Sequence, residues 1–148
     1  MADIILTGEV EEMLILKARE ARGRAYAPYS RFRVGAALLA ANGSIYTGCN
    51  VENASYGAAC CAERSAVFAA VADGQTAFVC LAVAGSGPGY ITPCGICRQV
   101  LSEFAGDDFP VLLCAQNDYK KVTLSKLLPF AFRTEQMKEN HTGQDIYG

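Results

Sequence analysis

The chain has 148 residues, of which 51% are hydrophobic and 19% are charged, and its formal net charge is −2 at pH 7. This length fits one domain with a substantial core, no apolar run is long enough to cross a membrane, and the basic residues are scattered. We therefore expect a single domain over residues 1–148 that acts on a small molecule and binds neither nucleic acid nor a membrane.

Cysteine usage and the N-terminus point to a cytoplasmic chain. Seven cysteines are an odd number, which disfavours a complete disulfide framework and favours reduced thiols. The first residues lack the basic region and the cleavage site of a signal peptide. Metal binding, core packing or catalysis must then account for the cysteines.

The first predicted element is a helix over residues 9–25. Thr7 can cap it, and three glutamates fall in its first turn, where the helix dipole favours acidic groups. Its apolar spacing predicts a buried face made of Val10, Met13, Leu14, Ala18 and Ala21.

A hairpin follows, with strands over 32–40 and 44–50 joined at Asn42-Gly43, because Asn-Gly between two apolar runs is a strong hairpin signal. Residues 61–73 are rich in alanine and predict a helix that ends at Gly74.

The second half of the chain alternates strands and helices. We predict a buried strand over 78–84, a glycine-rich loop over 85–89, a helix over 94–104, a final core strand over 111–115 and a short helix over 124–128 capped by Thr123. Residues 133–148 form a polar tail that we expect to be extended or mobile. This order predicts an α/β fold in which helices cover both faces of a mixed sheet.

Two cysteine clusters carry the chemistry: Cys60-Cys61-Ala62-Glu63-Arg64 and Pro93-Cys94-Gly95-Ile96-Cys97. Both open predicted helices, where the dipole and free amide groups lower a thiol pKa. Three of these thiolates can bind one zinc ion and leave a fourth position for water, as a catalytic site requires. Glu63 lies within a helical turn of Cys61, where a general acid/base is needed.

Other readings of the clusters exist. Cys94-x-x-Cys97 alone is equally typical of a redox dithiol or of half a structural zinc site, but a redox dithiol does not need Cys61 and Glu63. A Cys–His hydrolase is disfavoured because the one histidine, His141, lies in the polar tail.

The remaining cysteines are expected to pack rather than to bind metal. Cys60 neighbours a ligand, and adjacent helical side chains diverge by about 100°, so both cannot reach one ion. Cys49, Cys80 and Cys114 fall on or at the ends of predicted strands. Arg64 is interpreted with equal weight as a charge that offsets the thiolates or as an exposed helix arginine.

Together, several motifs make the chain similar to the small homotetrameric cytidine deaminases over about residues 9–132. They stand in the order and spacing of that family: Tyr29-Ser30-x-Phe32-x-Val34-Gly35-Ala36-Ala37, Gly48-Cys49-Asn50-Val51-Glu52-Asn53-Ala54, Cys61-Ala62-Glu63-Arg64, Pro93-Cys94-Gly95-x-Cys97-Arg98-Gln99 and Leu127-Leu128-Pro129.

The resemblance implies a three-layer α/β/α sandwich with a mixed five-stranded sheet and one zinc ion per subunit. It also implies that Cys61, Cys94 and Cys97 bind the zinc ion and that Glu63 transfers protons. The substrate would be bound through the ribose by Asn50 and Glu52, through packing of the base on Phe32, and through the pyrimidine ring by the Ala62 amide and the Thr92 carbonyl. Residues that reach a neighbouring subunit's site would be Ala54, Tyr56 and Phe132, and residues that hold the metal- and substrate-binding groups in place would be Arg64 and Gln99. The substrate sites of the homotetramer would thus be shared between subunits.

The implied activity is zinc-dependent hydrolytic deamination of cytidine and deoxycytidine to uridine and deoxyuridine, with release of ammonia, in pyrimidine salvage. A deaminase for a modified cytosine nucleoside, such as the blasticidin type, is the nearest alternative, and Glu52 argues against it. A non-catalytic zinc or redox module is the alternative from another class.

On the residues alone, some of these roles have plainer readings. Asn50 and Glu52 are equally consistent with a turn at the end of the hairpin, and Phe32 and Phe132 with core positions. Phe130 competes with Phe132 for the aromatic role, and the register with the Pro129 motif favours Phe132.

Overall fold

The computed structural model describes residues 4–138. One five-stranded sheet forms its centre, in the order β2-β1-β3-β4-β5. The strands are β1 (Val34–Ala40), β2 (Ile45–Cys49), β3 (Phe78–Gly85), β4 (Pro110–Cys114) and β5 (Tyr119–Thr123). The β3–β4 pair is parallel and the other three neighbouring pairs are antiparallel, so the sheet is mixed, as predicted.

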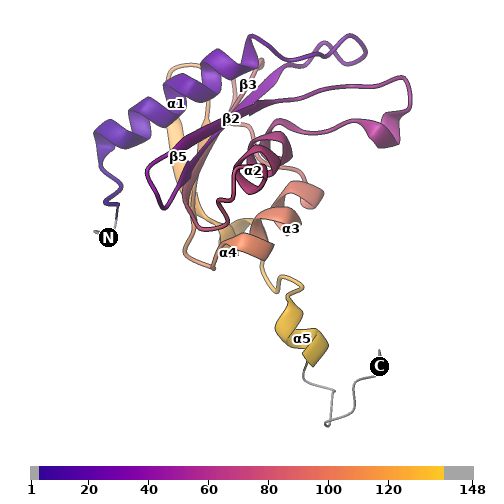
Figure 1. The fold of residues 1–148 in the computed structure, drawn as a ribbon. Coiled ribbons are helices and arrows are strands. Elements are labelled where there is room, and N and C mark those ends of the chain that lie inside the picture. The colour runs from indigo at the N-terminus through magenta and orange to yellow at the C-terminus, as the bar shows by residue number, and fades with distance from the viewer. Residues whose placement is uncertain (1–3, 139–148) are drawn as a thin grey trace.

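Helices cover both faces of this sheet. They are α1 (Gly8–Arg22), α2 (Ala62–Ala72), α3 (Gly95–Phe104), α4 (Leu124–Leu127) and α5 (Thr134–Lys138), with a short 3₁₀ helix η1 (Tyr56–Ala58). Figure 1 shows α1 along one face and α2 and α3 on the other. The predicted three-layer α/β/α sandwich is confirmed.

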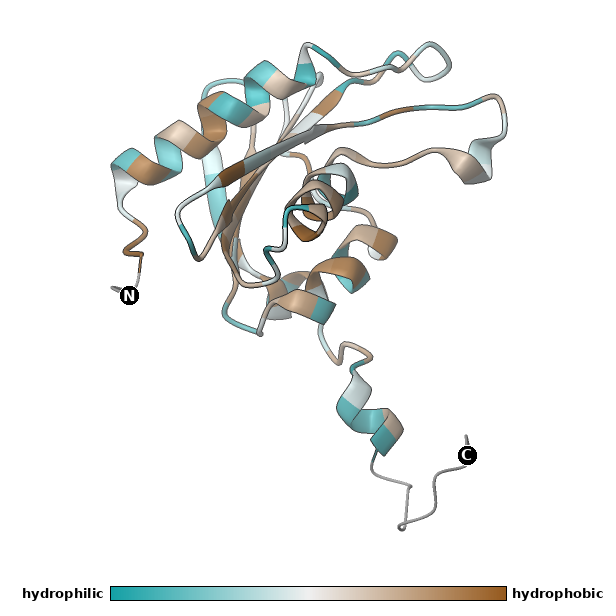
Figure 2. Cartoon of the chain, in the orientation of Figure 1, coloured by the Kyte–Doolittle hydropathy of each residue, from teal (hydrophilic) through white to brown (hydrophobic). Residues whose placement is uncertain are grey.

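Strand β1 is buried along its whole length because helices lie on both sides of it. Ala36 and Leu38 belong to the core cluster on the α2 and α3 side, whereas Ala37 and Leu39 belong to the cluster under α1. This double burial explains why β1 reads as a continuous apolar run rather than an alternating one. Figure 2 shows hydrophilic and hydrophobic residues alternating along α1, which packs one side on the sheet.

Two glycines set the spacing between the layers. A Cβ atom on Gly35 would lie 2.0 Å from the Ala18 carbonyl oxygen of α1, and one on Gly48 would lie 2.4 Å from the Ala62 carbonyl oxygen of α2. Each helix therefore rests directly on the backbone of the hairpin. The start of α2, which carries the first cysteine cluster, is placed by this contact.

The structure corrects two details of the first helix. It ends at Arg22 rather than at residue 25, and its buried face includes Ile15 instead of Met13, which is 50% exposed. The face runs through Leu14, Ile15, Ala18 and Ala21, so Met13 falls to one side of it. The predicted Thr7 cap is confirmed, because its Oγ1 accepts a hydrogen bond from the Val10 amide.

The end of the chain differs from the prediction in two details. The predicted final core strand is confirmed as β4, but it is not the last strand of the sheet, because β5, which was not predicted, follows and pairs with β4. Strand β5 is polar and lies at the edge of the sheet, so it lacks the apolar pattern that marks a core strand. Residues 134–138 of the tail are helical rather than extended, and His141 lies outside the described residues.

No helix within residues 4–138 is both long and apolar enough to cross a membrane.

Candidate active site

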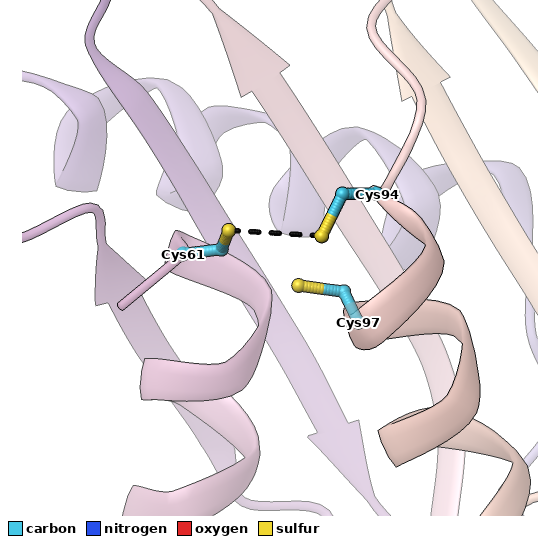
Figure 3. A group of neighbouring side chains, drawn as sticks. All are labelled: Cys61, Cys94 and Cys97. Carbon is cyan, nitrogen blue, oxygen red and sulfur yellow. Dashed lines mark hydrogen bonds between the residues drawn. The ribbon is translucent and has the colours of Figure 1, made fainter. Parts of the chain in front are cut away.

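Three cysteine side chains meet between the starts of α2 and α3. Cys61 occupies the N-cap position of α2, Cys94 has the same position on α3, and Cys97 lies in the first turn of α3. Their Sγ atoms all lie within 4.8 Å of one another, and those of Cys61 and Cys94 are 3.8 Å apart. In Figure 3 the three side chains point toward a common centre. The two clusters therefore form one site, as the sequence predicts.

The donor set fits zinc. Thiolate sulfur is a preferred zinc ligand, and three protein ligands leave one of four tetrahedral positions open. Among residues 4–138 this is the one group of three or more potential ligands close enough to hold an ion. Cys60 is outside it: its thiol donates to the Cys61 carbonyl oxygen at 3.6 Å and accepts from the Ser65 hydroxyl at 3.7 Å. The predicted packing role of Cys60 agrees with these contacts.

Arg64 supplies positive charge directly to this sulfur cluster. Its guanidinium donates to Cys61 Sγ at 3.2 Å, and its Nε, buried, has no partner among the described residues. Hydrogen bonds from the Cys97 thiol and from Arg64 lower the pKa of Cys61 to about 5. The pKa of Cys97 is raised, because its thiol donates to Cys61 and is itself buried. Arg64 therefore lies where it can offset thiolate charge, and it is not an exposed surface arginine.

Glu63 is the buried acid of the site, with 4% of its surface exposed. It lines a cavity of ≈ 150 Å³ together with Cys61 and Cys94. Burial is the main cause that raises the pKa of Glu63 to about 7, and the negative charge of Cys61 adds to it. A carboxyl with this pKa can both take up and release a proton near neutral pH.

The same cavity brings together three more of the predicted substrate residues, Asn50, Ala62 and Thr92. Asn50 is held by two hydrogen bonds, since its Oδ1 accepts from the Val34 amide and its Nδ2 donates to the Phe32 carbonyl oxygen, both at 2.8 Å. One amide proton and one lone pair of Asn50 remain free of these two bonds. The side chain thus fixes the segment that leads into β1 while it faces the cavity.

Sequence reasoning missed two residues of this cavity, Val34 and Ile91. Both are apolar. Val34 starts β1, and Ile91 directly precedes Thr92. The available signals were the place of Ile91 next to Thr92 and that of Val34 within the Tyr29–Ala37 motif, but an apolar residue carries no chemical signature of its own.

Glu52 lies in a neighbouring pocket of ≈ 300 Å³, lined also by Tyr29, Ser30 and Tyr56. Its Oε1 accepts from the amides of Tyr29 and Ser30 at 2.9 and 3.0 Å, and its Oε2 accepts from the Ser30 hydroxyl at 2.5 Å. The hydrogen bond from the Ser30 side chain is the main cause that lowers the pKa of Glu52. Glu52 is therefore an ionised group that organises the loop before β1, and its ribose role stays a prediction.

The other predicted residues lie outside the cysteine cavity. Phe32 is 43% exposed, Tyr56 77% and Phe132 59%, so the alternative core positions of Phe32 and Phe132 are wrong. Ala54 is exposed on the segment between β2 and α2, which extends away from the sheet in Figure 1. Gln99 of α3 donates a hydrogen bond to the Phe132 carbonyl oxygen at 2.8 Å and thereby attaches the segment around Phe132 to α3.

This fold and this site together define a zinc-dependent hydrolytic enzyme: three thiols converge at two helix starts, and a buried carboxyl with a pKa near neutrality faces the same cavity. Residues 9–113 match the family described as "Cytidine and deoxycytidylate deaminase zinc-binding region". The chain belongs to this family.

Individual relatives agree with that assignment. The chain is 50% identical over 127 residues to a cytidine deaminase of Sporosarcina psychrophila, covering 85% of this chain and 93% of the relative. It is 48% identical over 129 residues to a cytidine deaminase of Halalkalibacterium halodurans, covering 86% and 98%. A solved structure of cytidine deaminase from Burkholderia pseudomallei superimposes with a TM-score of 0.79 at 47% identity, covering 86% of this chain and 100% of that one.

Proposed function

We propose that this protein hydrolyses cytidine and deoxycytidine to uridine and deoxyuridine, releasing ammonia in pyrimidine salvage. The observation that carries the proposal is the buried Glu63 carboxyl in one cavity with Cys61 and Cys94. Similarity at about 50% identity to curated cytidine deaminases supports the substrate. In the product, an oxygen atom from water replaces the amine at C4 of the cytosine ring.

Cys61, Cys94 and Cys97 would hold the zinc ion, which when bound lowers the pKa of water in the site. Glu63 takes a proton from the attacking water and passes it to N3 of the ring. It then takes the second proton of that water from the hydroxyl now bonded to C4 and delivers it to the amine nitrogen, so that the C4 carbonyl forms as the C–N bond breaks and ammonia leaves. A pKa near 7 suits both halves of this transfer, because one carboxyl must accept and donate at the same pH. The Arg64 guanidinium offsets the negative charge of the thiolates throughout.

The remaining residues would position the nucleoside. Asn50 and Glu52 bind the ribose hydroxyls, the Ala62 amide and the Thr92 carbonyl read the ring, and Phe32 packs on the base. Support comes from the cavity that Asn50, Ala62 and Thr92 share with Glu63. It also comes from the Asn50 bonds to the segment that carries Phe32.

We further propose a homotetramer in which Ala54, Tyr56 and Phe132 complete a neighbouring subunit's site. Tyr56 and Phe132 are large, exposed and outside the cysteine cavity of their own chain, which supports this arrangement. Sedimentation at micromolar concentration should give four times the subunit mass of 15.8 kDa. A monomer with full activity would contradict the shared site.

The protein would work as a single domain in the cytoplasm on free nucleosides rather than polynucleotides. Three reduced thiols are needed for the metal site, and a net charge of −2 does not favour a nucleic-acid backbone. Single-stranded DNA and RNA should therefore remain unchanged in the assay below.

The decisive experiment is a spectrophotometric assay of cytidine, deoxycytidine and cytosine, combined with zinc analysis of the same preparation. We expect about one zinc per chain and turnover of both nucleosides. Zinc-loaded protein that deaminates neither nucleoside would refute the proposed function. Zinc-free protein that reduces disulfides would instead identify a redox module, and turnover of blasticidin S alone would identify the alternative deaminase.

A further inference from the structure

A second pocket, of ≈ 520 Å³, lies at the C-terminal end of α1 and shares no lining residue with the cysteine cavity. Three arginines line it: Arg19 and Arg22 from the last turns of α1, and Arg33 from the segment before β1. None of its other lining residues carries a charge; they are Gly23, Ser86, Gly87, Pro88 and Gln116. A chain with a net charge of −2 thus gathers three guanidinium groups around one concave surface.

Backbone carbonyl oxygens hold these arginines in place. Arg19 donates to the carbonyl oxygens of Ala115 and Gln116 at 2.9 and 3.3 Å. In the same way, Arg22 donates to Gly85 at 2.7 Å and Arg33 to Gly23 at 3.3 Å. Each guanidinium has five N–H groups, so every one keeps donors beyond those used here.

No carboxylate among residues 4–138 forms an ion pair with any of the three. The two ion pairs within that range join Lys121 to Glu11 and Arg133 to Asp107. The C-terminal end of α1 does attract cations, but a helix end carries only about half an elementary charge. That partial charge is too small to balance three guanidinium groups, two of them half-buried.

We propose that this pocket binds a phosphate group, either as inorganic phosphate or as part of a phosphorylated small molecule. Guanidinium presents paired N–H groups that match phosphate oxygens, and charge-assisted bonds of this kind are among the strongest in proteins. Arginines already fixed by carbonyl bonds lose little freedom when the anion arrives. The pocket has the volume of a small-molecule site and exceeds what a single phosphate fills.

The test is equilibrium dialysis of the zinc-loaded, full-length protein against radiolabelled inorganic phosphate or ATP at low ionic strength. Saturating uridine is included to keep nucleotide out of the candidate active site. We expect saturable binding with a dissociation constant below about 1 mM that weakens as salt is added. ATP binding at least about tenfold tighter than inorganic phosphate would identify a phosphorylated molecule, and equal affinity would identify free phosphate.

Matched variants locate the site. Arg33→Gln, at an exposed position, should weaken binding at least about fivefold, because it removes a charged donor. Arg24→Gln removes an exposed arginine close to the same helix end that does not line the pocket, and should bind like the parent. Circular dichroism and zinc content verify that both variants fold.

Two outcomes would overturn the proposal. One is the absence of saturable binding for both anions, which is also the expected result if a carboxylate of a second copy fills the pocket. The other is an equal loss in Arg24→Gln and Arg33→Gln, which would show that the binding is general attraction to the basic surface.

Discussion

Two consecutive residues of α2, Glu63 and Arg64, have different environments although they are neighbours in the chain. Successive helical side chains point about 100° apart, so Glu63 faces the buried cavity while Arg64 reaches back to Cys61. Burial raises the pKa of Glu63 and favours its neutral form, whereas Arg64 stays charged beside the sulfur of Cys61. We therefore propose that proton transfer and charge compensation belong to different side chains of one helical turn.

Glu63→Gln should keep zinc but lower kcat by at least about 100-fold, because an amide cannot carry a proton between water, ring and amine. The measurement is deamination of cytidine with zinc content determined in parallel. Glu9→Gln, at an exposed position of α1, is the control and should be as active as the parent. Retained activity of Glu63→Gln would reassign the proton carrier.

The cysteine doublet provides a second residue-scale prediction. Cys61→Ala should lose zinc, whereas Cys60→Ala should retain it, because only Cys61 Sγ lies with Cys94 and Cys97. Metal analysis of the two purified variants distinguishes them. The reverse result would make Cys60 the ligand.

At the scale of elements, the site depends on how closely α2 lies on the hairpin. Gly48 of β2 leaves no room for a side chain, because an added Cβ would meet the backbone of Ala62 and Ala66 at 2.4 and 2.5 Å. The first residue of α2 is Ala62, directly between Cys61 and Glu63. Displacement of the helix would therefore move a ligand and the acid together.

Gly48→Ala should destabilise the protein by about 1–3 kcal/mol and lower its zinc content, because rigid backbone must shift to admit the methyl group. Urea unfolding and metal analysis measure the two effects. Gly106→Ala is the matched control, since nothing lies within 4 Å of the added Cβ there. Equal stability of the two variants would show that α2 adapts without strain.

Glu11 joins α1 to the edge strand β5. Its carboxylate accepts from Lys121 Nζ and from the Tyr119 hydroxyl, both at 2.7 Å. Burial alone would raise the pKa of Glu11, but these hydrogen bonds outweigh it and hold the pKa below the ordinary 4.5. The ionised form therefore stabilises the fold above that value, and the contribution is lost as the pH falls through the lowered pKa.

Glu11→Gln should reduce the free energy of unfolding by about 1–3 kcal/mol at pH 7, the range for hydrogen bonds to a charged group. The difference from the parent should shrink as the pH is lowered below 4.5. Urea unfolding across this range is the measurement, with Glu12→Gln, an exposed neighbour, as the control. A difference that is independent of pH would mean that packing, not ionisation, is responsible.

At the scale of the whole molecule, the metal site joins α2 and α3 at their N-termini. One ligand precedes α2 and two belong to the start of α3, so a bound ion links segments that are distant in the sequence. A ligand that binds only the folded state stabilises it by mass action. Metal binding and global stability should therefore be coupled.

Removal of zinc with a chelator under reducing conditions should lower the melting temperature by at least about 5 °C, since about 1 kcal/mol corresponds to roughly 2–4 °C in a chain of this size. Calorimetry at fixed protein concentration measures the change, and zinc addition should restore it. An unchanged melting temperature would contradict a metal that links the two helices.

Much of this protein is determined by local sequence. The Asn42-Gly43 hairpin, the capped first helix and the two helix starts with their cysteines follow from short-range patterns, and the structure confirms them. Glu63 was identified from its spacing to Cys61. These features depend on neighbours a few residues away, so the sequence displays them directly.

Tertiary structure decided the rest. Strand β5 is polar and is recognised only by its pairing with β4. Whether Arg64 contacts a thiol or faces solvent depends on the orientation of α2, which only the structure gives. The basic pocket assembles Arg19, Arg33 and Ser86 from three separate segments. Pairing partners, burial and the meeting of distant charges arise from packing across the whole chain, which no local pattern encodes.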